Sequence, residues 1–266
     1  MTPLQRATAM ADFAPDRIVA VASGKGGVGK TWFSVSLCQA LALRRRKALL
    51  FDADMGLANV DVQIGLMPEQ DVARAVVNGV PLAKVVEPAL GGLFDVIAGQ
   101  SGSGSLGRLT AAQLNALVIG LDALAPRYDH VVLDLGAGVE ESVMRMAGAA
   151  ARCIVLITDE PTSLTDGYAF IKVARTRFPQ LGFDVVVNMA DSPREGERTY
   201  ATMRRACESF LKFAPPLLGI VRADRRVKEA IRRQTPLLTC HPDADAAHDV
   251  KAIAAALASQ RAAAHG

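Results

Sequence analysis

The residues with the clearest chemical potential are a run of glycines and lysines near the start of the chain. This run reads GKGGVGKT over Gly24–Thr31, follows the apolar stretch IVAVAS and precedes a helical pattern. Glycines at such a junction let backbone N–H groups turn inward around phosphate oxygens. The start of the following helix adds partial positive charge. The pattern therefore predicts a phosphate-binding loop, or P-loop.

The loop has separate roles for its two lysines. We expect Lys30 to bridge the β- and γ-phosphates of a nucleoside triphosphate, and the hydroxyl of Thr31 to bind Mg²⁺. Lys25 stands at a position that the ordinary pattern leaves free, so it is either a solvated surface lysine or a cation that reaches phosphates held by a second subunit. The nucleotide-binding residues predicted in the loop are Gly24, Lys25, Gly26, Gly27, Val28, Gly29, Lys30 and Thr31.

Acidic residues follow two further apolar runs. Phe51–Asp54 reads FDAD, and Asp134 comes at the end of VVLD. Carboxylates at the carboxyl ends of parallel strands beside a P-loop strand can hold Mg²⁺ and water near the phosphates. We expect Asp52 and Asp134 on the metal side and Asp54 next to the attacking water. A cap or turn role is the alternative for either residue of FDAD. Gly138 is expected to place its N–H on the γ-phosphate, as part of a switch that senses the nucleotide.

The elements that must position these residues alternate between short apolar runs and helical patterns. Continuous β-branched runs are typical of parallel strands that are covered on both faces. The alternation predicts an α/β fold with a doubly wound, mostly parallel sheet flanked by helices. The expected strands are Ile18–Ala22, Ala48–Phe51, Phe94–Ile97, Val131–Leu133, Ile154–Ile157, Val185–Val187 and Leu217–Val221. The expected helices are Trp32–Arg45, Ala111–Leu124, Leu164–Arg177 and Glu197–Lys212.

Composition narrows the class of protein. The chain has 266 residues, 50% of them apolar and 21% charged, which excludes disorder as the main state. No apolar run reaches the length of about 18 residues that a membrane-spanning helix needs, and the N-terminus lacks the core of a signal peptide, so we expect a cytoplasmic protein. The four cysteines and four histidines show no metal-ligand spacing. We expect a loose arm at 1–16, then one domain over 17–266 with a surface loop at Gly99–Gly107.

With its additional lysine, GKGGVGKT resembles the deviant Walker A motif of the MinD/ParA class of P-loop ATPases, and the resemblance extends from about Arg17 to about Leu257. Three stretches are similar to the flagellar-number regulators called FlhG, FleN or YlxH. The first two resemble the switch I and switch II regions of that subfamily. The stretches are FDADMGLANVDVQIGL (Phe51–Leu66), DLGAGVEESVMRM (Asp134–Met146) and TDEPTSLTDGYAFIKV (Thr158–Val173).

The resemblance implies an enzyme that hydrolyses ATP with Mg²⁺ and forms an ATP-dependent homodimer. Lys25 would then contact phosphates across the dimer, Asp54 would activate water, and Asp52 would be its neighbour on the metal side. Asn188 matches the adenine-reading Asn of the family, because an amide both donates and accepts hydrogen bonds. Its alternative role is a turn cap. Asp224 matches a second segment on the adenine side.

The resemblance also implies a regulator of flagellar number or placement in the cytoplasm or at the cell pole. Its partner would be a flagellar or polar protein, such as an FlhF-like GTPase, a C-ring protein or a transcription activator. One alternative is a regulator that acts mainly by binding a transcription factor. Another is a ParA-type, DNA-associated positioning ATPase, since RADRRVKEAIRR over Arg222–Arg233 holds six basic residues. A solvated helix or a protein-docking face is the competing interpretation of that segment.

Two further features receive structural interpretations. The Ala-rich tail carries only Val250, Ile253 and Leu257 as a narrow apolar stripe. It has few cations for lipid headgroups, so it predicts a helix that docks on the domain rather than a membrane-binding helix. Trp32 comes directly after the P-loop, and we interpret it as helix packing rather than as a platform for a base.

Overall fold

The computed structural model describes residues 16–54, 56–99 and 109–264. The predicted arm at 1–16, apart from Asp16, and the predicted loop at Gly99–Gly107, apart from Gly99, lie outside the described residues. The P-loop and the acidic positions predicted from the sequence all lie within them.

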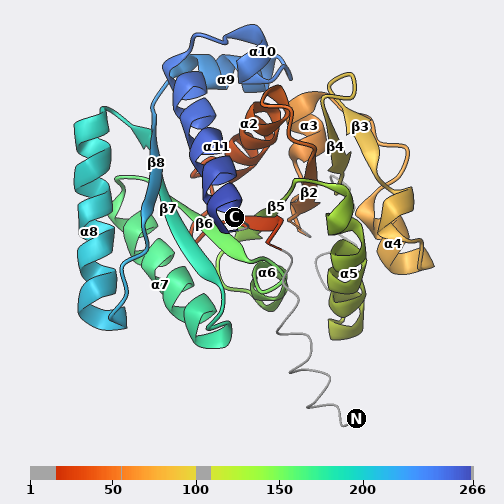
Figure 1. Ribbon diagram of the computed structural model, residues 1–266, viewed down its shortest axis with the longest axis horizontal. Coiled ribbons are helices and arrows are strands. Elements are labelled where there is room, and N and C mark those ends of the chain that lie inside the picture. The colour runs from red at the N-terminus through yellow and green to blue at the C-terminus, as the bar shows by residue number, and fades with distance from the viewer. Residues whose placement is uncertain (1–15, 55, 100–108, 265–266) are drawn as a thin grey trace.

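A single eight-stranded sheet runs through the described residues in the order β3-β4-β2-β5-β1-β6-β7-β8 (Figure 1). Only the pair β3–β4 is antiparallel, so the prediction of a mostly parallel sheet is confirmed. The edge strand β3 has no predicted counterpart, because three residues with a central proline carry no strand pattern. The strands are β1 Ile18–Ser23, β2 Ala48–Ala53, β3 Glu87–Ala89, β4 Phe94–Ile97, β5 His130–Ala137, β6 Arg152–Ile157, β7 Gly182–Ala190 and β8 Leu217–Arg222.

Helices cover both faces of this sheet, as a doubly wound fold requires. Successive residues of β1 point to opposite faces, so Ala20 packs in one hydrophobic cluster and Val21 in the other. The cluster of Val21 is covered by α2 Lys30–Leu43, α3 Val60–Ile64, α9 Arg225–Arg232, α10 Leu237–Cys240 and α11 Asp245–Ala264. The cluster of Ala20 is covered by α4 Val72–Asn78, α5 Ala111–Leu124, α6 Glu141–Ala147, α7 Pro161–Arg177 and α8 Pro193–Leu211. The short 3-10 turns are η1 Leu82–Lys84 and η2 Ala125–Arg127.

The helix boundaries correct several predictions. The α2, α7 and α8 helices begin before their first apolar residues, at Lys30, Pro161 and Pro193. Proline suits the first helical turn because the missing N–H has no intrahelical partner there. The basic segment Arg222–Arg233, for which a solvated helix was one interpretation, is only partly helical, because Arg222 ends β8 and Asp224 caps α9.

The last helix confirms the prediction of a docking element. The side chains of Val250, Ile253 and Leu257 are at most 3% exposed, and they pack in the cluster that contains α2. Figure 1 shows α11 lying alongside α2 on one face of the sheet. Among the described helices, none combines the length and the apolar character that crossing a membrane demands.

Candidate functional site

The P-loop connects β1 to α2 at the carboxyl edge of the sheet. Gly29 caps α2 with φ of 89°, in the left-handed region that favours glycine. A Cβ atom on Gly24 would lie 2.1 Å from the backbone of Asp166, so α7 approaches the loop too closely for any side chain there. Glycines are therefore needed both to turn the loop and to pack it.

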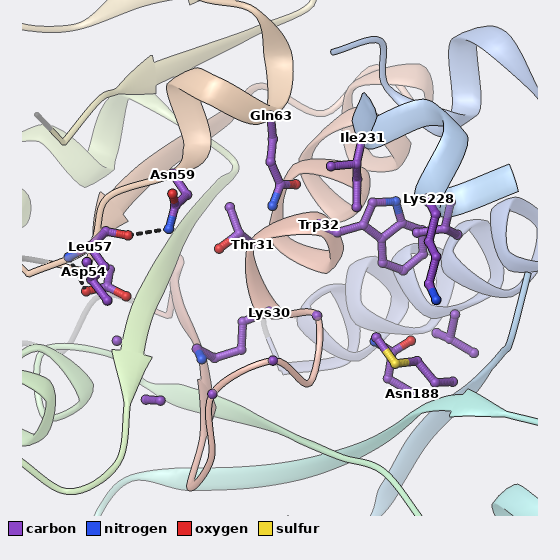
Figure 2. A pocket seen from close by; sticks show the side chains of 18 of the residues that line it. Lys30, Thr31, Trp32, Asp54, Leu57, Asn59, Gln63, Asn188, Lys228 and Ile231 are labelled. Carbon is purple, nitrogen blue, oxygen red and sulfur yellow. Dashed lines mark hydrogen bonds between the residues drawn. The ribbon is translucent and has the colours of Figure 1, made fainter. Parts of the chain in front are cut away.

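Lys30 is a nearly buried cation on the inner side of the loop. Its side chain is 9% exposed, and its Nζ donates to Ser23 Oγ at 3.0 Å. Burial lowers the pKa of Lys30, while the nearby carboxylates of Asp134 and Asp54 act in the opposite direction. The side chains of Lys30 and Thr31 both line the cavity above the loop (Figure 2). A partly dehydrated ammonium at this point is suited to binding a phosphate.

Asp134 lies directly behind Thr31. Ser34 Oγ donates to Asp134 Oδ1 at 3.0 Å, and the side chain of Thr31 also hydrogen-bonds to this carboxylate. Burial raises the pKa of Asp134 to about 6, and the bond with Thr31 opposes this shift. A buried carboxylate joined to a threonine hydroxyl supplies the hard oxygen ligands that Mg²⁺ prefers, so these residues fit that ion.

Asp52 holds the segment that follows β2. Its carboxylate accepts hydrogen bonds from the backbone N–H groups of Asp54 at 3.2 Å and of Asn59 and Val60 at 3.0 Å each. Asp52 pairs in register with Asp134 across β2 and β5, and burial together with that charge raises the pKa of Asp52 to about 8. Asp52 therefore positions the segment that carries Asp54.

The described residues contain no cluster of three or more His, Cys, Asp or Glu side chains that could hold a metal by themselves. A Mg²⁺ ion bound with a nucleotide takes most of its ligands from phosphates and water, so one or two carboxylates suffice.

Asp54 lines the cavity at the edge nearest β5. Its Oδ1 accepts from the N–H groups of Gly56 at 3.3 Å and Leu57 at 3.0 Å, so the turn role considered from the sequence is present. No hydrogen bond to Oδ2 comes from the described residues, which leaves this oxygen for water. Gly138 does not line the cavity, and its N–H donates to the carbonyl of Ser23 at 3.0 Å. A contact between Gly138 and a phosphate would require that bond to open.

Asn188 lies at the opposite end of the cavity, where β7 ends. Its side chain is 2% exposed, and its Nδ2 donates to the carbonyl of Val28 at 2.8 Å. This bond fixes the orientation of the amide, because a flipped amide would face one carbonyl oxygen with another. Oδ1 is then left as an acceptor. Such an acceptor can receive a hydrogen bond from the amino group of adenine. It would repel the carbonyl oxygen of guanine, which is itself an acceptor.

Asp224 lies at the same end but is engaged within the fold. Its carboxylate accepts from the backbone N–H and the guanidinium of Arg226, and these bonds hold the pKa of Asp224 below its usual range. Its position makes Asp224 a helix cap at the wall of the cavity, and the segment around it forms that wall.

The cavity has a volume of about 940 Å³, which is in the range of small-molecule sites. The predicted residues that line it are Gly26, Gly27, Gly29, Lys30, Thr31, Asp54, Asn188 and Asp224. The predicted residues that do not line it are Gly24, Lys25, Val28, Asp52, Asp134 and Gly138. Lining residues that the sequence interpretation did not assign to the site include Trp32, Asn59, Gln63, Glu140, Met189, Lys228 and Ile231.

Lys25 points away from the cavity that its own loop encloses. Its ammonium forms an ion pair with Glu160 and donates to Thr162 Oγ1 at 3.0 Å, both at the start of α7. The side chain is 37% exposed. The two lysines of the loop therefore have opposite orientations, with Lys30 inside and Lys25 on the outer surface.

Comparison with known proteins agrees with this geometry. Residues 19–237 match the family model described as the CobQ/CobB/MinD/ParA nucleotide binding domain. The chain is 36% identical to the antiactivator FleN of Pseudomonas aeruginosa, covering 92% of this chain and 87% of FleN. It is 27% identical to the flagellum site-determining protein YlxH of Helicobacter pylori, covering 92% of this chain and 82% of YlxH.

Solved structures show the same fold. The cell division ATPase MinD of Pyrococcus furiosus superposes with a TM-score of 0.79 at 20% identity, over 92% of this chain and 99% of MinD. MinD of Pyrococcus horikoshii, solved with Mg-ADP, superposes with a TM-score of 0.77 at 20% identity, over 90% of this chain and 94% of that protein. The match of residues 19–237 to the family model and the identity to FleN show that the chain belongs to the MinD/ParA family of P-loop nucleotide-binding ATPases.

Proposed function

We propose that this protein is a Mg²⁺-dependent ATPase that dimerises when it binds ATP and separates after slow hydrolysis. The observation that carries this proposal is the opposite orientation of the two loop lysines. Lys30 faces the cavity of its own subunit. Lys25 lies on the outer side of the loop, where it can reach the phosphates of a second subunit only if two cavities face each other.

The choice of ATP rests on Asn188. Because Val28 fixes its amide, the free oxygen accepts a hydrogen bond from adenine and has no donor for guanine O6. A mismatch of this kind leaves buried polar groups without partners, which costs affinity. We therefore expect ATP to bind more tightly than GTP.

Different residues of the chain have different roles around the γ-phosphate. Lys30 neutralises charge on the β- and γ-phosphates, and Asp54 orients water through Oδ2 while Oδ1 holds the turn at Gly56. Thr31 and Asp134, with Asp52 beside them, would hold Mg²⁺, which would neutralise phosphate charge. A switch must stay in its ATP-bound state for some time, so we expect slow hydrolysis in the absence of a partner.

The mouth of the cavity has apolar side chains that support a dimer. Leu57 is 75% exposed, Met189 44% and Ile231 37%, and all three line the cavity. Large apolar side chains in such a position are typical of surfaces that meet a partner. A second copy of the chain, with Lys25 directed at this mouth, would cover them.

We further propose a role in flagellar number or placement. This proposal rests on the similarity to FleN, an antiactivator, and to YlxH, a flagellum site-determining protein. The partner would be a flagellar or polar protein, and a GTPase, a C-ring protein and a transcription activator stay as candidates.

A DNA-binding role receives less support from the basic segment. Arg222 pairs with Asp245 and Asp249 on α11, Arg226 pairs with Asp224, and Arg233 pairs with Glu229. Phosphate binding by these arginines would first require the release of their carboxylate partners.

Sedimentation with ATP and Mg²⁺ tests the proposed switch. We expect Lys25→Ala to stay monomeric and to lose hydrolysis, because the contact between subunits is missing. Asp54→Asn should dimerise and remain dimeric, because the amide keeps the turn at Gly56 but lacks the charge that orients water. Asp54→Ala is the matched variant without the turn contact. The proposal is refuted if Lys25→Ala dimerises like the wild type.

A further inference from the structure

Trp32, the only tryptophan of the chain, lies on the wall of the nucleotide cavity. Figure 2 shows its indole beyond Thr31 on α2, beside Ile231 and Lys228 of α9. The side chain is 6% exposed and packs in the hydrophobic cluster of α2, which confirms the packing part of the sequence interpretation. The same ring is nevertheless part of the ligand cavity.

Packing alone leaves one atom of this side chain unexplained. The indole Nε1 is buried, and within the described residues it has no hydrogen-bond acceptor. A leucine or a phenylalanine would fill the same space without burying a donor, and an unmet buried donor is unfavourable. A ligand with oxygen acceptors in the cavity would satisfy it once the side chains that cover Nε1 in the ligand-free protein move aside.

The position of Trp32 indicates which part of the ligand it meets. Lys30 and Thr31 mark the phosphate end of the cavity, and Asn188 marks the base end. In Figure 2 the indole lies above Asn188, on the side of α9, and Thr31 lies to its left. A nucleotide that contacts both ends must therefore carry its ribose and base past this ring.

We propose that Trp32 is a specificity-determining residue that binds the nucleoside part of the ligand. The side chains that cover it in the ligand-free protein move aside, the ring then contacts the ribose and purine, and its N–H donates to a nucleotide oxygen. This inference rests on the proposed function, since it concerns the same nucleotide. It adds that affinity for the nucleoside comes from α2 itself, one residue beyond the phosphate-binding Thr31. Aromatic rings bind the faces of bases in this way because each base presents a π-surface.

The uniqueness of Trp32 gives a direct readout that does not depend on hydrolysis. Titration of the wild-type protein with Mg-ADP should change the tryptophan fluorescence with a saturation curve that matches the Kd from calorimetry. Inorganic tripolyphosphate with Mg²⁺, which has no nucleoside, should bind in calorimetry with a much smaller fluorescence change. An unchanged fluorescence at saturating Mg-ADP would overturn the inference.

Substitutions separate recognition of the nucleoside from support of the loop. Trp32→Leu keeps an apolar side chain in the core, and we expect roughly ten- to a hundredfold weaker binding of ADP, with tripolyphosphate affinity kept within about threefold. Trp32→Phe keeps a ring and removes the N–H, so its ADP affinity should lie between those of Trp32→Leu and the wild type. Thermal melting of the ligand-free variants checks that each one folds.

Lys30→Met distinguishes a failure of the inference from a failure of the proposed function. This variant should lose affinity for ADP and tripolyphosphate alike, because it removes the phosphate contact. If Lys30→Met binds both as the wild type does, the nucleotide site itself is wrong. If Lys30→Met behaves as expected but Trp32→Leu loses equal affinity for both ligands, or for neither, then Trp32 does not recognise the nucleoside.

Discussion

Buried charged groups occur at both ends of the parallel strands, and the two ends differ in whether these groups have an ion-pair partner. At the amino ends of β6 and β7, Asp184 is fully buried and accepts from Arg152 Nε at 2.8 Å. At the carboxyl ends of β2 and β5, Asp52 and Asp134 pair in register, and neither forms an ion pair with any described residue. The amino end has its counter-charge bound directly within the fold, whereas the carboxyl end has two neighbouring carboxylates and the nearby ammonium of Lys30, which forms an ion pair with neither.

We infer from this difference that the fold keeps charge for stability at the amino ends and for a ligand at the carboxyl ends. Burial raises the pKa of Asp184, and its hydrogen bond with Arg152 acts in the opposite direction. Burial also raises the pKa values of Asp52 and Asp134, to about 8 and about 6. A cation that arrives with a ligand would stabilise carboxylates in this state, so their raised pKa values make these residues candidates for a functional site.

The comparison is tested most strongly at Lys30. In Lys30→Met the phosphate loses its buried counter-charge, so we expect the affinity for ATP to fall by about a hundredfold or more, or about 3 kcal/mol. The free energy of unfolding of the ligand-free protein should stay the same or rise, because a dehydrated ammonium is removed. Calorimetry and urea unfolding measure the two quantities. A large loss of stability with unchanged ATP affinity would place Lys30 among the structural charges.

Asp184 should give the opposite pattern. Asp184→Ala leaves Arg152, which is about one-third exposed, without its partner. We expect the free energy of unfolding to fall by about 2 kcal/mol, less than for a fully buried pair because water reaches the guanidinium. ATP affinity should not change. Asp184→Asn, which keeps an acceptor for Arg152, should lose less stability. A drop in ATP affinity in either folded variant would remove the distinction between the two ends.

The positions of candidate site residues could be predicted where they stand at the carboxyl ends of strands. Lys30, Thr31 and Asp134 could be placed because the carboxyl ends of neighbouring parallel strands meet at one edge. The turn at Asp54 was open to two interpretations because a short Asp-containing segment also forms hydrogen bonds with its own backbone. The N–H of Gly138 was assigned to a phosphate, but its bond with Ser23 depends on tertiary packing, which a sequence does not display.

The parts of the fold that were missed are short or depend on distant segments. The helices α3, α4, α6 and α10 and the strand β3 are too brief to show a period. The place of Trp32 in the cavity depends on α9, far along the chain. The contact between Lys25 and Glu160 requires the start of α7 to approach the P-loop, which the close packing at Gly24 makes visible only in the folded protein.

The contact between Lys25 and Glu160 gives the smallest expected effect. The side chains are 37% and 59% exposed, and an exposed ion pair contributes at most about 1 kcal/mol. If Lys25 reaches the phosphates of a second subunit, it must first leave Glu160, so this pair opposes dimerisation. Glu160→Gln should therefore strengthen the ATP-bound dimer by no more than about fivefold for each of the two pairs that a symmetric dimer must open. Since Lys25 does not line its own cavity, the ATP affinity of the monomer should not change.

Sedimentation of Glu160→Gln with ATP in the Asp54→Asn background, which prevents hydrolysis from dispersing the dimer, measures this effect. Thr162→Val is the matched control, because it removes the neutral contact with Lys25 and leaves the charge of Glu160 in place. Its dimerisation should differ less from the parent than that of Glu160→Gln. A weaker dimer in Glu160→Gln would mean that Glu160 contributes a contact between the subunits instead of holding Lys25 back. The start of α7 would then belong with Lys30 and Asp134, among the charges kept for a ligand or partner, and not with the stabilising pair of Arg152 and Asp184.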